Sequence, residues 1–94
     1  MVPWGAVSEL NVNSEGAFRQ YIYEIKARHS VPLQLMNAQT ICFVLKGEVT
    51  VIFSESFSLD VRERVHVTLW PNQKHGFYAK EHTKLLLIEF STGT

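Results

Sequence analysis

The chain has 94 residues, of which 46% are hydrophobic and 19% charged, and this balance excludes a largely disordered chain. A domain of this length buries about 60% or more of its unfolded surface, so it needs no disulfide or metal to form a core. Nine Lys and Arg balance nine Asp and Glu without a basic cluster, which excludes binding to nucleic acid through phosphate neutralisation.

The first residues, MVPWG, lack the features of a secretory signal, and no apolar run reaches membrane-spanning length. We therefore expect a cytoplasmic protein that binds no membrane. One domain is predicted over residues 1–94. Residues 1–16 form an N-terminal lead-in that packs on the rest of the domain or on a partner subunit.

Proline, glycine and asparagine interrupt the lead-in, so at most one short strand is predicted there, near residues 6–12. Trp4 is expected to dock on the core. Aromatic and β-branched residues then alternate with others over residues 20–25, which is typical of a strand.

Residues 26–30 are polar and predict a turn, and Pro32 excludes a central ladder position at the start of the short apolar run 33–36. The segment 40–53, TICFVLKGEVTVIF, then predicts a β-hairpin. Its two arms are rich in Ile, Val and Phe, and Gly47 between them adopts positive φ without steric cost.

Alternating apolar residues predict further strands at 57–61, 65–69, 75–80 and 84–90. In the turn before the third of these, Asn72 is the residue best suited to left-handed geometry. No segment has a helical period. The fold class is therefore all-β, with seven or eight or more short antiparallel strands in a sandwich or barrel and little or no helix.

Three segments resemble the cupin family, whose members are jelly-roll barrels. FVLKGEVTV is similar to the end of the first cupin motif, and LWPNQKHGF at 69–77 is similar to the second, in which a proline turn delivers a histidine into the barrel. KLLLIEF at 84–90 resembles the strand that follows. The resemblance covers residues 17–90 and implies a small RmlC-like jelly roll.

The resemblance also locates the positions of the family's metal ligands. Counted back from the hairpin glycine, the glutamate position falls on Thr40. The histidine pair falls on Gln34 and Met36, or on Leu33 and Leu35 if the loop is one residue longer. Of the four ligands only His75 is present, and a single imidazole does not hold a metal ion against water. We therefore expect a metal-free cupin with no cofactor.

The same positions supply the candidate ligand-binding residues, which are Gln34, Met36, Thr40, Cys42, His75 and Phe77. An amide and an adaptable thioether suit an organic ligand, such as a sugar or another small polar compound, better than a metal. His75 is the one candidate catalytic residue because its ordinary pKa lies near neutrality. The alternative is that these side chains only fill a small barrel, which leaves an interaction module without a ligand.

Two enzymatic alternatives remain open. The pattern YIY at 21–23 and the closing LLLIEFS bear a weaker resemblance to the dTDP-sugar 3,4-ketoisomerases, which implies a sugar-nucleotide isomerase or epimerase with His75 as general base and Tyr21 or Tyr23 as acid. The second alternative is a cupin metalloenzyme with substituted ligands.

Both faces of residues 40–45 are apolar. A strand buried on both sides needs a second covering layer, which a partner subunit in a homodimer would supply. Burial beneath the chain's own N-terminal segment is the competing explanation.

Overall fold

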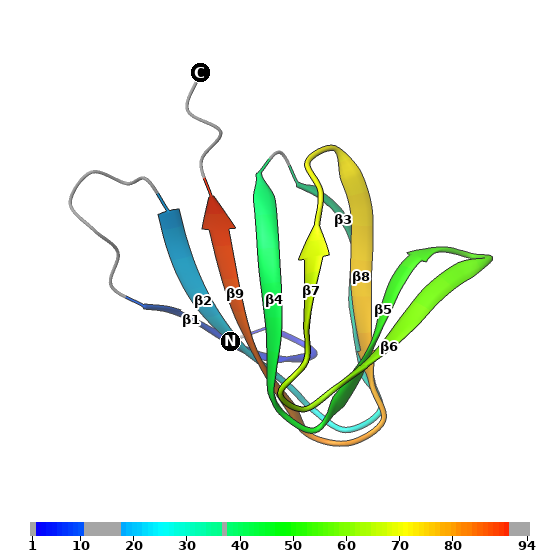
Figure 1. The fold of residues 1–94 in the computed structure, drawn as a ribbon. Helices are drawn as coiled ribbons and strands as arrows, with labels where there is room; N and C mark the ends of the chain where they lie inside the picture. Colours follow the sequence, from blue (N-terminus) through cyan, green and yellow to red (C-terminus); the bar gives the residue numbers. More distant parts are fainter. Residues whose placement is uncertain (1, 11–17, 37, 91–94) are drawn as a thin grey trace.

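Nine strands and no helix make up the described residues of the computed structural model, which are 2–10, 18–36 and 38–90 (Figure 1). The all-β prediction is confirmed. The strands are β1 (Gly5–Leu10), β2 (Phe18–Ile25), β3 (His29–Met36), β4 (Gln39–Lys46), β5 (Glu48–Ser54), β6 (Phe57–Arg62), β7 (His66–Leu69), β8 (Gln73–Ala79) and β9 (Thr83–Phe90).

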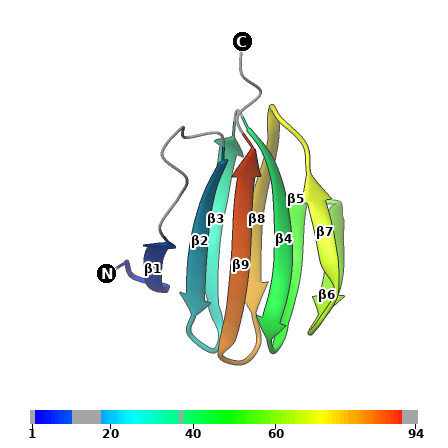
Figure 2. The same cartoon turned by 60° about the vertical axis from the view of Figure 1, so that its left-hand side comes forward.

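The strands form two antiparallel sheets that face each other (Figure 2). One sheet has the order β1-β2-β9-β4-β7 and the other the order β3-β8-β5-β6. The chain changes sheet at most of its turns, which is the jelly-roll arrangement predicted from the sequence. We call one end of the barrel the closed end, because the sheets converge there at the turns β2–β3, β4–β5, β6–β7 and β8–β9 (Figure 1). The opposite end, where the sheets diverge, is the open end.

The predicted hairpin over residues 40–53 is wrong in its pairing. Both strands and the turn exist, and Gly47 has φ 87°, but β4 pairs with β7 and β9 whereas β5 pairs with β6 and β8. The turn therefore carries the chain from one sheet to the other. The two strands thus belong to different sheets, and the buried Val44 and Val49 face the core from opposite sides.

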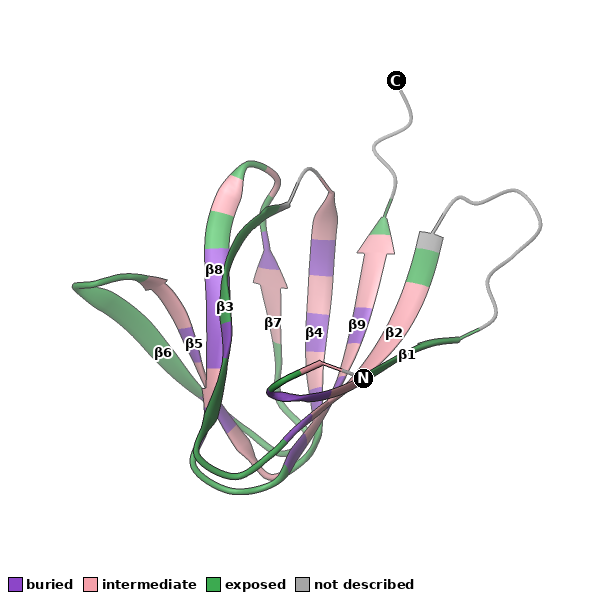
Figure 3. Cartoon of the chain, turned by 180° about the vertical axis from the view of Figure 1, so that it is seen from behind, coloured by how far each residue is buried: buried purple, intermediate pink, exposed green. Residues whose placement is uncertain are grey.

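Alternation along the strands builds this core. Thr40, Cys42 and Val44 of β4 are buried, whereas Ile41 and Phe43 between them are half-buried. Figure 3 shows the same concentration of buried positions along the middle of β8 and β4, with exposed positions on β1 and β6 at the sheet edges. The strand 40–45 is thus fully buried on one face only.

The N-terminal lead-in adds to this sheet at its edge. Along its whole length β1 pairs with β2, and Trp4 is buried with its ring centroid 5.1 Å from that of Tyr23, as expected for docking on the core. The strand expected near residues 6–12 is therefore confirmed over its described part, and residues 11 and 12 lie outside the described residues. Nothing in the described lead-in covers the outer face of β4.

Two local predictions are also confirmed. Asn72 has φ 63°, in the left-handed region. Pro32 lies in β3, an edge strand, within a register shift between Val31 and Gln34. Gly76 of β8 accommodates this irregularity, because a Cβ there would lie 2.7 Å from the carbonyl oxygen of Val31.

Candidate ligand site at the open end

His75 faces the barrel interior from β8. It is 4% exposed, and its register partner on β3 is Gln34. The Nδ1 atom lies 3.3 Å from the carbonyl oxygen of Gln73. Because a carbonyl only accepts, Nδ1 carries the hydrogen in this bond, and Nε2 of the neutral ring is left as an acceptor. Burial lowers the pKa of His75, which keeps the ring neutral at pH 7.

Aromatic rings continue from His75 across the barrel. The ring centroids of His75 and Phe77 are 5.7 Å apart, and Phe77 meets Tyr23 of the opposite sheet edge-on at 6.3 Å. Phe77 is only 2% exposed, and its buried ring packs against the imidazole of His75. The contact also ties β8 to β2.

The facing sheet contributes a row of polar side chains near the open end. Arg19 of β2 and Thr40 of β4 are the register partners of Glu89 on either side of β9. Glu89 follows the buried residues Leu85 and Leu87 at the two-residue period of the strand, so its carboxylate lies on the inner face. Thr40 is fully buried, and its hydroxyl donates to the carbonyl of Ala38 at 3.3 Å.

These groups perturb one another's pKa values. Burial raises the pKa of the Glu89 carboxyl, an effect that Arg19 opposes and the Glu9 carboxylate increases. Burial likewise raises the pKa of Tyr23, and the charge of Glu89 adds to this rise. Tyr23 therefore remains a hydrogen-bond donor at neutral pH. The open end therefore holds both donors and acceptors, of which Tyr23 and Glu89 are partly desolvated whereas Arg19 is exposed.

The predicted site residues are only partly brought together. His75, Phe77, Thr40 and Cys42 are all buried, with the first two in ring contact and the last two on the inner face of β4. Gln34 shares the face of its partner His75 but is exposed, so it lies at the rim of the barrel. The side chain of Met36 lies outside the described part of the structure.

Cys42 lacks the surroundings of a reactive thiol. Burial raises its pKa to about 12, and the chain has no other cysteine with which it could pair. Its contribution is to packing, as a small apolar side chain.

Glu89 and Arg19 are absent from the residues predicted to form the site. The signal for Glu89 is present in the closing strand, where it occupies the same alternation as the inward-facing leucines. A carboxylate at such a position needs a partner or a function because its desolvation is costly.

The residues at the cupin metal positions do not fit a metal ion. Beside His75 they offer an exposed amide and a hydroxyl that is already bonded to the backbone. No three His, Cys, Asp or Glu side chains in ranges 2–10, 18–36 and 38–90 are grouped to hold a metal ion. His66 lies on the outer face of β4's neighbour β7, with its ring 5.2 Å from that of Phe43.

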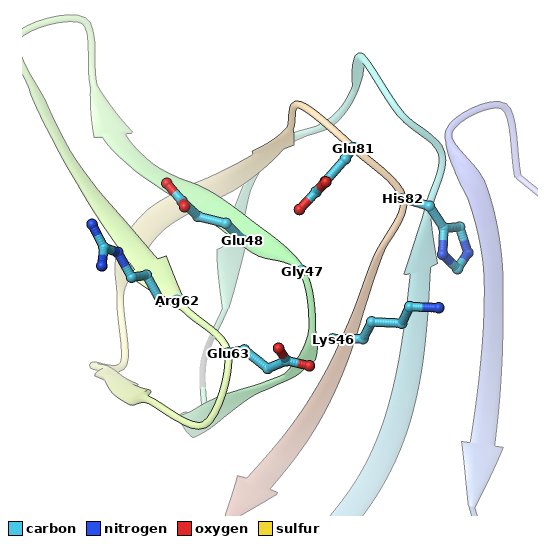
Figure 4. A pocket seen from close by; sticks show the side chains of 7 residues that line it. All are labelled: Lys46, Gly47, Glu48, Arg62, Glu63, Glu81 and His82. Carbon is cyan, nitrogen blue, oxygen red and sulfur yellow. The ribbon is translucent and has the colours of Figure 1, made fainter.

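A groove of about 620 Å³ lies at the closed end (Figure 4). Its walls carry both signs of charge, and Lys46 and His82 extend to one side while Glu48 and Arg62 extend to the other. The groove is lined by Lys46, Gly47, Glu48, Arg62, Glu63, Glu81 and His82. It is remote from the open end and shares no residue with the site described above.

The chain matches no protein-family model and no curated protein. Its structure is similar to that of an RmlC-like cupin protein from Desulfovibrio desulfuricans, with TM-score 0.81 and 14% identity over 96% of this chain and 89% of that one. A cupin superfamily protein from Desulfitobacterium hafniense gives TM-score 0.78 and 16% identity over 96% and 82% of the two chains.

The DMSP lyase DddQ from Ruegeria pomeroyi gives TM-score 0.82 and 16% identity, over 94% of this chain and 47% of the lyase. This chain therefore spans about half the length of that enzyme. The protein has the cupin fold, as its sequence motifs predicted. No helix in the described ranges is long and apolar enough to cross a membrane.

Proposed function

We propose that this protein is a cupin-fold domain that binds a small, neutral, hydroxylated organic molecule at its open end without a metal ion. The observation that supports this most strongly is the inward-facing row of Arg19, Glu89 and Thr40 opposite the buried His75. A cytoplasmic location remains part of this proposal.

The chemistry of the open end favours a polyol such as a sugar. Each hydroxyl of a polyol both donates and accepts, and the site supplies acceptors in His75 Nε2 and Glu89 together with donors in Arg19 and Tyr23. The rings of Tyr23 and Phe77 provide apolar surface for the carbon skeleton.

Charge separates neutral ligands from phosphorylated ones. The described polar row and its neighbour contain one cation, Arg19, and two carboxylates, Glu89 and Glu9, while burial keeps His75 neutral. A phosphate would meet no excess of positive charge here. Neutral sugars are therefore preferred over sugar phosphates and nucleotide sugars.

Calorimetric titration with neutral hexoses and pentoses, in parallel with their phosphates, tests the proposal. We expect a neutral sugar to bind, and Glu89→Gln to weaken it by about tenfold or more, because a hydrogen bond to a charged group is lost. Glu55→Gln, in the exposed β5–β6 turn, is the matched control and should bind normally. Preferential binding of the phosphates, or equal affinity of the two variants, would contradict the proposal.

A second candidate is an isomerase or epimerase that acts on sugar nucleotides. It is favoured by the neutral His75, whose free Nε2 suits a general base, and by the protonated Tyr23 beyond Phe77, which suits an acid. In this case His75→Ala abolishes turnover of a dTDP-linked hexose, whereas in a binding domain it only weakens the sugar complex. Stoichiometric Mn, Fe, Ni or Zn in untagged protein would instead favour a metalloenzyme.

A further inference from the structure

The outer face of the five-stranded sheet carries a continuous apolar surface. Ile22, Leu86 and Phe43 are aligned in register across β2, β9 and β4, and Ile88 and Ile41 form the next row. All five belong to strands whose opposite face contributes to the core, so they point away from it. We call these five residues the outer apolar face.

The outer face of the other sheet is different in character. Its strands present Thr50, Asp60, Lys74 and Tyr78, and the Thr50 hydroxyl donates to an Asp60 carboxylate oxygen at 2.8 Å. Ile52 and Leu35 also point outward there, but Ile52 lies between Ser58 and Gly76 and Leu35 lies opposite Lys74, so the apolar side chains are separated. A continuous apolar surface, such as that across β2, β9 and β4, marks an interaction site.

The described part of the chain leaves the outer apolar face uncovered. The described lead-in extends the sheet edge through β1 and sends Trp4 into the core, and no other described element packs over β2, β9 and β4 from outside. A covering layer must therefore come from elsewhere.

We propose that a second copy of this chain covers the outer apolar face and forms a two-fold symmetric dimer. Two identical sheets have the same twist, so they pack face to face as the layers of a β-sandwich do. The five strands lie about 4.8 Å apart and range from about 13 Å long for β7 to about 26 Å for β2, β4 and β9, so they present roughly 540 Å² per copy, or about 1,100 Å² in total, which is just above the roughly 1,000 Å² of a specific interface.

The charges of the chain are compatible with the association of two identical copies. The chain carries no net charge, so two copies do not repel one another at long range. The charged groups on this face lie in the row nearest the closed end, where Glu24 pairs with Lys84 at 3.7 Å and with His82 at 3.5 Å. They form a polar rim beside an apolar centre, which is the usual anatomy of an interface.

Sedimentation of the full chain over a wide concentration range tests the dimer, with Ile41→Glu as the disrupting variant. Ile52→Glu is the matched control, because Ile52 is also a half-buried isoleucine that points outward from a central strand, but in the other sheet. Symmetry places the new charge in the interface twice. We expect Ile41→Glu to weaken the dimer by about 100-fold or more and Ile52→Glu by less than about threefold.

The folded state of each variant is checked by circular dichroism. The midpoint of thermal unfolding gives a second readout, since it rises with protein concentration for a dimer and loses this dependence in Ile41→Glu. A wild-type chain that stays monomeric at high concentration would overturn the proposal. So would an Ile41→Glu variant that dimerises as well as Ile52→Glu, which would locate the interface on another surface.

Discussion

The hydroxyl of Thr83 connects the two sheets to each other at the closed end. Its Oγ1 atom lies 3.1 Å from the carbonyl oxygen of Glu48, 35 residues away in the opposite sheet, and 2.9 Å from that of Glu81. Thr83 is completely buried. The single hydroxyl hydrogen of Thr83 is therefore shared between two carbonyl groups, at the points where the chain passes from β8 to β9 and from β4 to β5.

Thr83→Val should lower the free energy of unfolding by about 1–2 kcal/mol, because valine keeps the volume but removes the donor from buried carbonyls. Urea denaturation measures this difference. Thr50→Val is the control, since the Thr50 hydroxyl bonds to Asp60 at an exposed position, and it should cost less than about 0.5 kcal/mol. Equal losses in the two variants would show that the bond between the sheets contributes nothing.

Gly47→Ala should destabilise the protein by about 1–3 kcal/mol, because its φ of 87° is strained for any other residue. The added Cβ would also lie 2.8 Å from Thr83 Oγ1 and 2.9 Å from the His82 carbonyl oxygen. The control is Arg64→Gly, because Arg64 has a φ of 71° and glycine adopts this angle without strain. Glycine also raises the conformational entropy of the unfolded chain, which opposes this gain, so the free energy of unfolding should change by less than about 0.5 kcal/mol. Thermal or urea unfolding of both variants checks the pair.

The burial of His75 predicts a dependence of stability on pH. Its pKa in the folded chain lies below the ordinary value of 6.5. Well above pH 6.5 the His75 imidazole is unprotonated in both the folded and the unfolded chain. As the pH falls through 6.5, the unfolded chain takes up a proton on this ring before the folded chain does. The free energy of unfolding therefore decreases until the pH reaches the lower pKa of the folded state. His75→Gln should therefore lose less stability than wild type between pH 7.5 and pH 5. His29→Gln, in an exposed position, should retain the wild-type slope.

Glu89 gives stability the opposite dependence on pH. Its pKa is raised above 4.5, so the folded state holds the proton more tightly and stability is lost as the pH rises from 4.5 through the folded pKa. Glu89→Gln should therefore be more stable than wild type at pH 7, and this gain should disappear near pH 4. Urea denaturation at the two pH values tests it. A variant that is less stable at pH 7 would mean that the electrostatic attraction of Arg19 for the Glu89 carboxylate outweighs the cost of burial.

Cys42 should resist alkylation in the folded protein. Its thiol is buried with a pKa near 12, so at pH 8 almost no accessible thiolate is present. Iodoacetamide should modify it only as fast as the chain unfolds, and readily in urea. Modification of the folded protein at the rate of a free thiol would contradict the packing of β4.

Local patterns in the sequence predicted most of the strands and turns, because alternation and turn chemistry depend on residues close together in the chain. The positive φ of Asn72 and Gly47 follows from steric rules alone. The cupin fold was predicted from short motifs whose order matches the observed jelly roll. The pairing of the strands could not be predicted in this way. Val44 and Val49 are buried both in a hairpin and in two strands that face each other across a core, so the same alternation fits both arrangements.

The candidate site depended more strongly on the tertiary structure. The sequence by itself determined that His75 follows a proline turn and that Gln34, Met36 and Thr40 stand at the metal positions of the cupin motif. Only the register of three strands placed Arg19, Glu89 and Thr40 in one inward row, and only the position of Gln34 at the rim of the barrel left it exposed. The physical reason is that these residues lie up to 70 positions apart, so their meeting is decided by strand pairing and by the packing of the two sheets.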